Sequence, residues 1–211
     1  MSEGKDFYNL EVSYFSQLDN VYAPFISCYP TAMAMAIDYC LRIENKDKRD
    51  IGCTYDIQLE DFINRITMSD EIQVWLKKNV GRLGSWVWKY KPRTIAYVEE
   101  YIFNKLMNKH GFRCQFTTNV TFDEYCDIID SHRLPQVLHG NFSKKTTVQG
   151  HIITGTGYAK LGRRVIANDP FGDAGTKYLD RDGKKVEYYF TDFFIKNKKL
   201  NTMWLTSILR A

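Results

Sequence analysis

A change in the spacing of apolar residues near Gly111 constrains the fold of this chain more than any other feature. Before Gly111, apolar side chains recur three and four residues apart, which is typical of amphipathic helices. After it, short apolar segments are separated by turn residues, which is typical of β-strands. Helices followed by an antiparallel sheet indicate the α+β class. We therefore predict a single domain over residues 1–211, with a helical half at about 20–110 and a sheet half at about 111–211.

The predicted helices differ in how clearly their ends are marked. A helix over 29–43 carries Pro30 in its first turn, where the missing N–H costs nothing. Three more helices are predicted between 57 and 109 from apolar residues at helical spacing. A further helix over 121–129 begins with Thr121 and has a glutamate three residues later, which is the capping-box pattern.

The predicted strands are short and are bounded by turn residues. Asp182 and Gly183 form a dipeptide typical of a tight hairpin turn between the two strands that flank it. The strands are predicted at 11–17, 112–116, 134–138, 151–158, 164–167, 176–179, 186–190 and 202–209.

The composition excludes several classes of protein. The chain is 44% hydrophobic and 26% charged, so it is neither disordered nor collagen-like. Its net charge of +4 is too small to indicate a nucleic-acid partner. The longest purely apolar run, at 32–37, is far too short to span a membrane. No signal peptide is visible, so we expect a cytoplasmic location, with release from the cell without a signal left open.

The cysteines are not spaced as metal ligands or as a disulfide framework. Their number is odd, and no two of them form a C-x-x-C pair. We expect free thiols in a reducing compartment. The five are Cys28, Cys40, Cys53, Cys114 and Cys126.

Cys28 directly precedes the helix predicted at 29–43. A thiol at a helix N-terminus lies at the positive end of the helix dipole, which favours the thiolate. The free N–H groups there can also stabilise an oxyanion. A cysteine near a helix start is more often structural, so this feature alone does not assign a nucleophile.

His151 is the histidine that the predicted sheet places beside a carboxylate. It opens the strand at 151–158, and the strand at 164–167 returns antiparallel to it. This hairpin brings His151 close to Asp169 at its open end, where opposed Cβ atoms lie about 5 Å apart. A polar pair at a sheet edge is the alternative interpretation. The other histidines are expected at a helix end, in a polar turn and at a strand end, and are His110, His132 and His139.

Cys28, His151 and Asp169 together make a nucleophile, a base and a group that orients the base. Gln17 lies eleven residues before Cys28, and its side-chain amide can share an oxyanion hole with the Cys28 backbone N–H. Asn168 competes with Asp169 for the orienting role. Neighbouring strand residues point to opposite faces, so only one of the two can reach His151.

Four short motifs follow one another along the chain. They are Tyr-Phe-Ser-Gln-Leu-Asp-Asn at 14–20, Cys-Tyr-Pro-Thr-Ala-Met-Ala-Met at 28–35, Gly-His at 150–151 and Asn-Asp-Pro-Phe-Gly at 168–172. In this order and at this spacing, the motifs resemble those of the papain-like cysteine peptidases. The resemblance is to the branch related to the bacteriocin peptidases, which cleave after double-glycine leaders. The chain resembles free-standing bacterial or phage relatives, because no transporter is fused to it.

The resemblance implies a role for four residues. Gln17 matches the oxyanion glutamine, Cys28 the nucleophile, His151 the base and Asp169 the orienting residue, so it favours Asp169 over Asn168. The chain departs from the family at Tyr29, where the family usually has glycine. That bulk is expected to reshape the oxyanion hole or to narrow the cleft.

The function that follows is thiol-dependent hydrolysis of a peptide or other amide bond, with no metal and no organic cofactor. The expected substrate is a peptide, a protein or a peptidoglycan peptide, and no nucleic acid is expected as a partner. Two alternatives stay open, an acyl transferase on the same triad and a non-hydrolytic module that binds or inhibits a host or cell-wall partner. The sequence does not give the oligomeric state, the source organism or the cleavage preference.

One aromatic segment has no assigned role. Trp86 and Trp88 alternate within 81–93, a stretch that interrupts the predicted helices. We favour the interpretation that this segment packs over the hydrophobic core. The alternative is that its aromatic side chains form one wall of the substrate cleft.

Overall fold

The computed structural model describes residues 5–21, 23–81, 92–140, 150–193 and 203–211. The helices are α1 (Cys28–Ile43), α2 (Leu59–Thr67), α3 (Asp70–Asn79), α5 (Pro92–Met107) and α6 (Phe122–His132). Single 3-10 turns lie at Gln17–Asp19, Lys48–Ile51, Asn108–His110, Ala174–Thr176 and Phe190–Phe193. The strands are β1 (Phe7–Asn9), β2 (Phe112–Val120), β3 (Gln136–Gly140), β4 (His151–Ala159), β5 (Arg164–Asn168), β6 (Val186–Tyr189) and β7 (Met203–Arg210). Trp86 and Trp88 lie outside the described residues.

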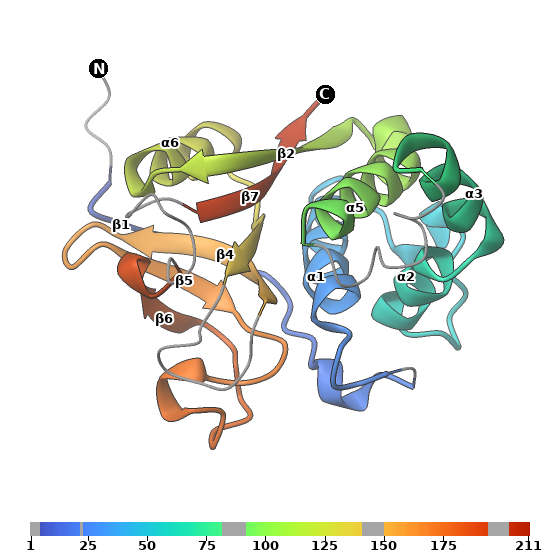
Figure 1. Ribbon diagram of the computed structural model, residues 1–211. Coiled ribbons are helices and arrows are strands. Elements are labelled where there is room, and N and C mark those ends of the chain that lie inside the picture. The colour runs from blue at the N-terminus through green and yellow to red at the C-terminus, as the bar shows by residue number, and fades with distance from the viewer. Residues whose placement is uncertain (1–4, 22, 82–91, 141–149, 194–202) are drawn as a thin grey trace.

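The helices and the sheet form two halves that lie side by side. Figure 1 shows α1, α2, α3 and α5 together on one side of the molecule, and the antiparallel sheet on the other. The seven described strands are ordered β2-β7-β3-β4-β5-β6, and β1 pairs with β4. Helix α6 covers the sheet face turned away from α1, where Phe122, Tyr125 and Ile129 pack against Leu138 and Ile153. The α+β class predicted from the sequence is confirmed.

Strand β4 is the centre of the molecule. All nine of its residues are buried, because α6 covers one face and the helical half covers the other. The Thr154 hydroxyl of β4 donates a hydrogen bond of 2.8 Å to the Ala32 carbonyl oxygen in the second turn of α1. This bond fixes the start of α1 relative to the start of β4, and those two starts carry Cys28 and His151.

The predicted helices are present, and their ends follow the predicted signals. Helix α1 begins at Cys28 and has Pro30 in its first turn. The predicted helices between 57 and 109 correspond to α2, α3 and α5. The Thr121 hydroxyl accepts from the Glu124 N–H while the Glu124 carboxylate accepts from the Thr121 N–H, which completes the capping box of α6.

The predicted strand at 11–17 is wrong. The first strand, β1, lies earlier at Phe7–Asn9, where it pairs with Gly157–Ala159 of β4. After Leu10, whose N–H donates to the Thr156 carbonyl oxygen, the chain forms no further strand pairing within the part of the protein that the structure describes. The alternation of polar and apolar side chains therefore extends along the sequence beyond the residues whose backbone pairs with a strand.

The predicted strand at 176–179, with its hairpin turn at Asp182 and Gly183, is also wrong. Lys177 and Tyr178 have φ angles of 58° and 61°, which a strand does not allow. The Tyr178 N–H instead donates to the Asp173 carbonyl oxygen within the loop. Strand β6 pairs with β5, so the segment 169–185 is one long connection between neighbouring strands.

Candidate active site

Cys28 is the first residue of α1 and is only partly buried, whereas the other four cysteines are buried. The first N–H groups of a helix have no partner inside the helix. The thiol therefore lies at the positive end of α1, beside backbone donors that can hold an anion. Among the five cysteines, this position makes Cys28 the thiol suited to act as a nucleophile.

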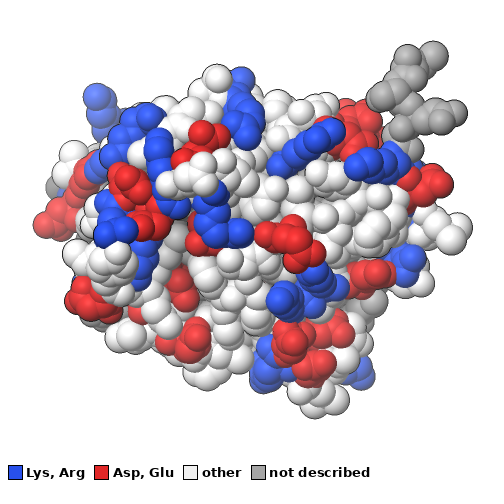
Figure 2. Space-filling view, turned by 180° about the vertical axis from the view of Figure 1, so that it is seen from behind, with Lys and Arg blue, Asp and Glu red and all other residues white. Residues whose placement is uncertain are grey.

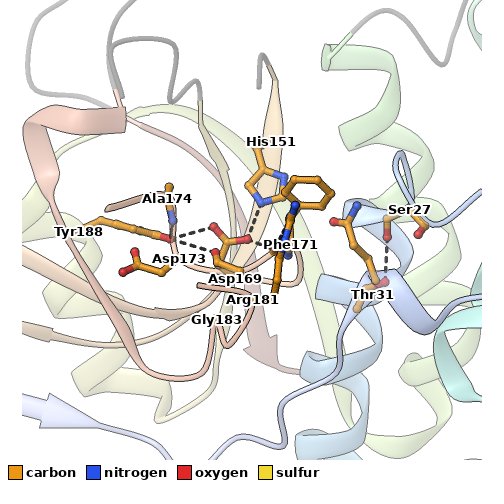
Figure 3. Close-up of polar contacts among 12 residues, drawn as sticks. Ser27, Thr31, His151, Asp169, Phe171, Asp173, Ala174, Arg181, Gly183 and Tyr188 are labelled. Atoms are coloured by element: carbon orange, nitrogen blue, oxygen red, sulfur yellow. Dashed lines mark hydrogen bonds and ion pairs between the residues drawn. The ribbon is translucent and has the colours of Figure 1, made fainter. Parts of the chain in front are cut away.

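A buried polar network fixes the chain that leads into Cys28. The Asn20 side-chain amide donates to the Ser27 hydroxyl at 2.7 Å and to the Thr31 hydroxyl at 2.9 Å. The Thr31 hydroxyl donates in turn to the Ser27 carbonyl oxygen. Figure 3 shows Ser27 and Thr31 at the start of the helix, opposite His151 and Asp169. The network holds the first turn of α1 in place around Cys28.

His151 and Asp169 form a buried pair. The Nε2 atom of His151 lies 2.6 Å from Oδ1 of Asp169, and the two residues are 3% and 0% exposed. Because Asp169 occupies Nε2, the other ring nitrogen, Nδ1, is the one that can exchange a proton with a thiol. The Cys28 side chain lies within hydrogen-bonding reach of this ring.

The charges at the site favour a protonated imidazole. Burial lowers the pKa of His151, but the negative charge and hydrogen bond of Asp169, together with Cys28, outweigh burial and raise the pKa to about 10. An imidazolium next to a thiol favours the thiolate form of that thiol. The geometry and the charges therefore suit an imidazolium that Asp169 holds beside Cys28.

Three donors hold the Asp169 carboxylate. Besides His151, the Phe171 N–H donates to Oδ1 at 2.9 Å, and the Tyr188 hydroxyl donates to Oδ2 at 2.9 Å. Figure 3 shows Tyr188, Asp169 and His151 in a row. A carboxylate bonded on both oxygens cannot rotate freely, so it fixes the orientation of the imidazole.

Asn168 turns away from His151. Its amide donates to the carbonyl oxygens of Val12 and Ser13, and its oxygen accepts from the Lys185 N–H. Asn168 thus ties the entry segment and the long loop to the end of β5. Of the two neighbours considered from the sequence, Asp169 is the one in contact with His151.

Gln17 is buried near the start of α1, in the 3-10 turn Gln17–Asp19. Its backbone N–H donates to the Pro170 carbonyl oxygen, which links it to the Asp169 loop. Its amide nitrogen donates to the Pro24 carbonyl oxygen at 2.7 Å, and its buried Oε1 has no partner among the described residues. An amide nitrogen carries two N–H groups, so one remains for an oxyanion.

Tyr29 does not cover the nucleophile. It is 6% exposed, and its side chain points into the helical core, where its hydroxyl accepts from the Thr67 hydroxyl. The bulk that replaces the family's usual glycine is accommodated below the site, and the expected narrowing of the cleft by Tyr29 is not seen.

Sequence patterns alone assign no role to several residues around the site. Asn20 lies in one of the four short motifs, and Tyr188 lies in a predicted strand. Tyr178 and Phe171 were not singled out, although both rings pack edge-on to His151. The sequence holds no signal for Tyr188 or Tyr178, because both depend on how the loop at 169–185 folds back.

The described residues hold no group of three or more potential metal ligands. No helix in the described parts of the chain combines the length and apolar character that crossing a bilayer requires. The face in Figure 2 carries interspersed basic and acidic side chains. Arg163 and Arg164 are paired with Asp123 and Glu187, respectively.

Comparison with known proteins places these features in a family. The model of the Peptidase_C39 like family matches residues 9–193, which is most of the chain and includes Gln17, Cys28, His151 and Asp169. No curated protein and no solved structure gave a match. The helical half beside an antiparallel sheet, with the site between them, is consistent with the papain-like α+β fold that this match implies.

Proposed function

From the premise that the chain belongs to the Peptidase_C39 like family, we propose that it is a cysteine peptidase that hydrolyses a peptide or related amide bond. In this proposal Cys28 is the nucleophile, His151 the general acid and base, Asp169 the orienting carboxylate, and Gln17 part of the oxyanion hole. The observation that carries the proposal is the buried pair of His151 and Asp169 beside a partly exposed Cys28 at the start of α1.

The first half of the reaction forms an acyl-enzyme. The Cys28 thiolate attacks the carbonyl carbon of the amide, and the carbonyl oxygen becomes an oxyanion. The Cys28 N–H and the Gln17 amide donate hydrogen bonds to that oxyanion. His151 then gives its proton to the leaving amine, the C–N bond breaks, and a thioester to Cys28 remains.

The second half releases the acid product. His151, now neutral, takes a proton from a water molecule that attacks the thioester carbonyl. The C–S bond breaks, the carboxylic acid leaves, and Cys28 and His151 return to the thiolate–imidazolium pair. Asp169 holds Nδ1 of His151 toward the reacting atoms throughout, because its own oxygens are fixed by Phe171 and Tyr188.

Turnover of a peptide mixture by the purified chain tests the proposal. We expect new N-termini to appear with the wild type and with Cys53→Ala, and to be absent with Cys28→Ala. Cys53 is a matched control because its thiol is buried in the helical core, away from His151. Cleavage that survives in Cys28→Ala, or a wild type that cleaves no peptide and shows no activated thiol, contradicts the proposal.

Hydrolysis and acyl transfer share every step up to the thioester. They differ only in whether water or an amine attacks it. Adding a labelled primary amine to the same reaction separates them, since incorporation of the label into the peptide assigns a transferase. If the wild type and Cys28→Ala both bind the peptide and neither cleaves it, the chain is the non-hydrolytic binding module.

The substrate class proposed is a peptide, as a free chain, a protein segment or a peptidoglycan peptide. The proposed location is the cytoplasm. Fractionation of cells that express the tagged chain tests the location, and recovery of the chain outside the cytoplasmic fraction contradicts it.

A further inference from the structure

Arg181 lies in the loop at 169–185, against the aromatic ring that packs on the candidate histidine. The central carbon of its guanidinium lies over the Phe171 ring, 4.8 Å from the ring centroid. The Phe171 ring packs edge-on to the His151 ring, with the two centroids 6.4 Å apart. Figure 3 shows Arg181 next to Phe171 and His151. Phe171 therefore connects a positive side chain to the residue that acts as acid and base in the proposed mechanism.

The path of the loop holds Arg181 in this place. The Asp173 N–H donates to the Asp180 carbonyl oxygen at 3.0 Å, and the Tyr14 hydroxyl donates to the Arg181 carbonyl oxygen at 3.3 Å. Gly172 has a φ angle of 115°, and a Cβ atom there would lie 3.0 Å from the Cα atom of Arg181. Glycine therefore allows the two arms of the loop to approach closely.

The guanidinium of Arg181 has hydrogen-bonding capacity that the chain does not use. Its Nη1 donates to the Phe171 carbonyl oxygen at 3.4 Å, and its other N–H groups have no acceptor among the described residues. No carboxylate in the described parts of the chain forms an ion pair with Arg181, whereas Arg164 pairs with Glu187. An arginine that stacks on a ring keeps the edge of its planar fork open, and that fork matches a carboxylate.

The acidic residues that flank Arg181 in the sequence serve the turns of the loop. The Asp180 carboxylate accepts from the Asp182 N–H at 2.9 Å, and the Asp182 carboxylate accepts from the Lys184 N–H at 3.0 Å. Asx turns of this kind hold a carboxylate against its own backbone. The guanidinium is therefore open to a carboxylate from outside the chain.

The position of Arg181 indicates which part of a substrate it can reach. In the proposed mechanism His151 gives its proton to the leaving amine, so the leaving fragment begins next to His151. The distances from Arg181 to the Phe171 ring and from that ring to His151 together correspond to about three residues of extended peptide, at about 3.3 Å per residue. Arg181 can therefore contact a group within the first residues of the leaving fragment.

We propose that Arg181 binds a carboxylate of the leaving fragment, within about three residues of the cleaved bond, and so selects acidic substrates. This inference rests on the proposed function, since it requires a peptide whose leaving amine passes His151. The carboxylate has two sources, the side chain of an aspartate or glutamate and the C-terminus of a short leaving fragment. Both present the same two oxygens to the guanidinium.

The test measures kcat/KM for pairs of peptides that differ only in an acid or the corresponding amide. In one set, glutamate or glutamine occupies each of the first three positions of the leaving fragment, and the C-terminus is amidated. In the other, short neutral leaving fragments end in a carboxylate or a carboxamide. We expect the wild type to favour the acid by about tenfold in at least one set, because hydrogen bonds to a charged group form. The set that shows the preference identifies the source.

Variants assign the preference to Arg181. In Arg181→Gln the ratio of kcat/KM for acid and amide should fall to about one, and in Arg181→Glu below one, because like charges repel. Arg113→Gln is the matched control, since Arg113 is exposed on β2, and it should keep the wild-type ratio. Each ratio compares two peptides on the same enzyme, so a change in the amount of folded protein or in thiol reactivity cancels.

Three outcomes contradict this inference. Equal kcat/KM for acid and amide in a wild type that cleaves through Cys28 overturns it and leaves the proposed function standing. An acid preference that survives in Arg181→Gln overturns it in the same way. A wild type that cleaves no peptide, with or without a carboxylate, overturns both.

Discussion

The Nε2 atom of His151 lies 2.6 Å from Oδ1 of Asp169, although the two residues do not face each other in the β4–β5 ladder. The last pair of that ladder at this end is Thr154 with Asn168, so Asp169 lies just beyond the strand. Its N–H donates to the Gly183 carbonyl oxygen, which turns the chain back. The carboxylate therefore reaches His151 diagonally, and the pair depends on the loop at 169–185 as much as on the sheet.

Gly183→Ala should displace Asp169. A Cβ atom at position 183 would lie 1.9 Å from the Asp169 carbonyl oxygen, so that backbone has to move. We expect a loss of peptide cleavage of at least about tenfold, because the carboxylate would no longer hold His151. Gly157→Ala is the matched control, since its Cβ would lie 2.0 Å from the Tyr8 carbonyl oxygen, at the β1–β4 pairing. Both variants should unfold at lower temperature, and equal activity per folded molecule in the two would contradict the prediction.

Tyr188→Phe should loosen Asp169 without removing its charge. The variant loses the hydrogen bond to Oδ2 of Asp169 and the one accepted from the Ala174 N–H. We expect a free energy of unfolding lower by about 1–3 kcal/mol and a lower kcat at unchanged KM. Tyr97→Phe, at an exposed position of α5, should change neither quantity. Denaturant unfolding and steady-state kinetics measure both effects, and a Tyr188→Phe variant with wild-type kcat would contradict the orienting role of Tyr188.

The His151–Asp169 pair predicts how stability depends on pH. The pKa of His151 is raised in the folded protein to about 10, above its ordinary value of about 6.5. The folded state therefore holds this proton more tightly, and the stabilisation is complete below about pH 6.5 and is lost as the pH rises through about 10. Asp169→Asn removes the cause of the raised pKa. The difference in free energy of unfolding between wild type and Asp169→Asn should narrow from about pH 6 to about pH 10, and a constant difference would contradict the prediction.

Asn20→Ala should disturb the start of α1. It removes both hydrogen bonds that tie the Asn20 amide to the Ser27 and Thr31 hydroxyls. We expect a loss of stability of about 1–3 kcal/mol and slower alkylation of Cys28 at low pH. Asn79→Ala removes a comparable side-chain bond, to the Trp75 carbonyl oxygen at the exposed end of α3, and should leave alkylation unchanged. Equal alkylation rates in the two variants would show that Asn20 does not position the nucleophile.

Local signals were enough to predict most of the helices. Pro30 marks the start of α1, and Thr121 with Glu124 marks the start of α6, because caps act within one turn. The strand ends were harder to predict, since pairing depends on residues distant in the sequence. The side chains of residues 11–17 alternate in polarity as in a strand, but these residues follow the segment that pairs with β4.

The four candidate residues could be named from the sequence because each lies in a short motif. The predicted contact between His151 and Asp169 is present, but the two residues meet diagonally and not as the opposed pair that the hairpin predicts. Tyr188 and Tyr178 could not be named, because a seventeen-residue connection brings them to the site and its path is set by contacts such as Gly183 against Asp169.

Alkylation of the native protein by iodoacetamide between about pH 5 and about pH 9, followed by mass mapping, tests the central claim most directly. The wild type is compared with His151→Ala and with His132→Ala, a histidine at the end of α6. The account predicts fast labelling of Cys28 alone below about pH 7 in the wild type and His132→Ala, and slow labelling in His151→Ala. Slow labelling spread over several cysteines, unchanged by His151→Ala, would contradict an activated thiolate–imidazolium pair.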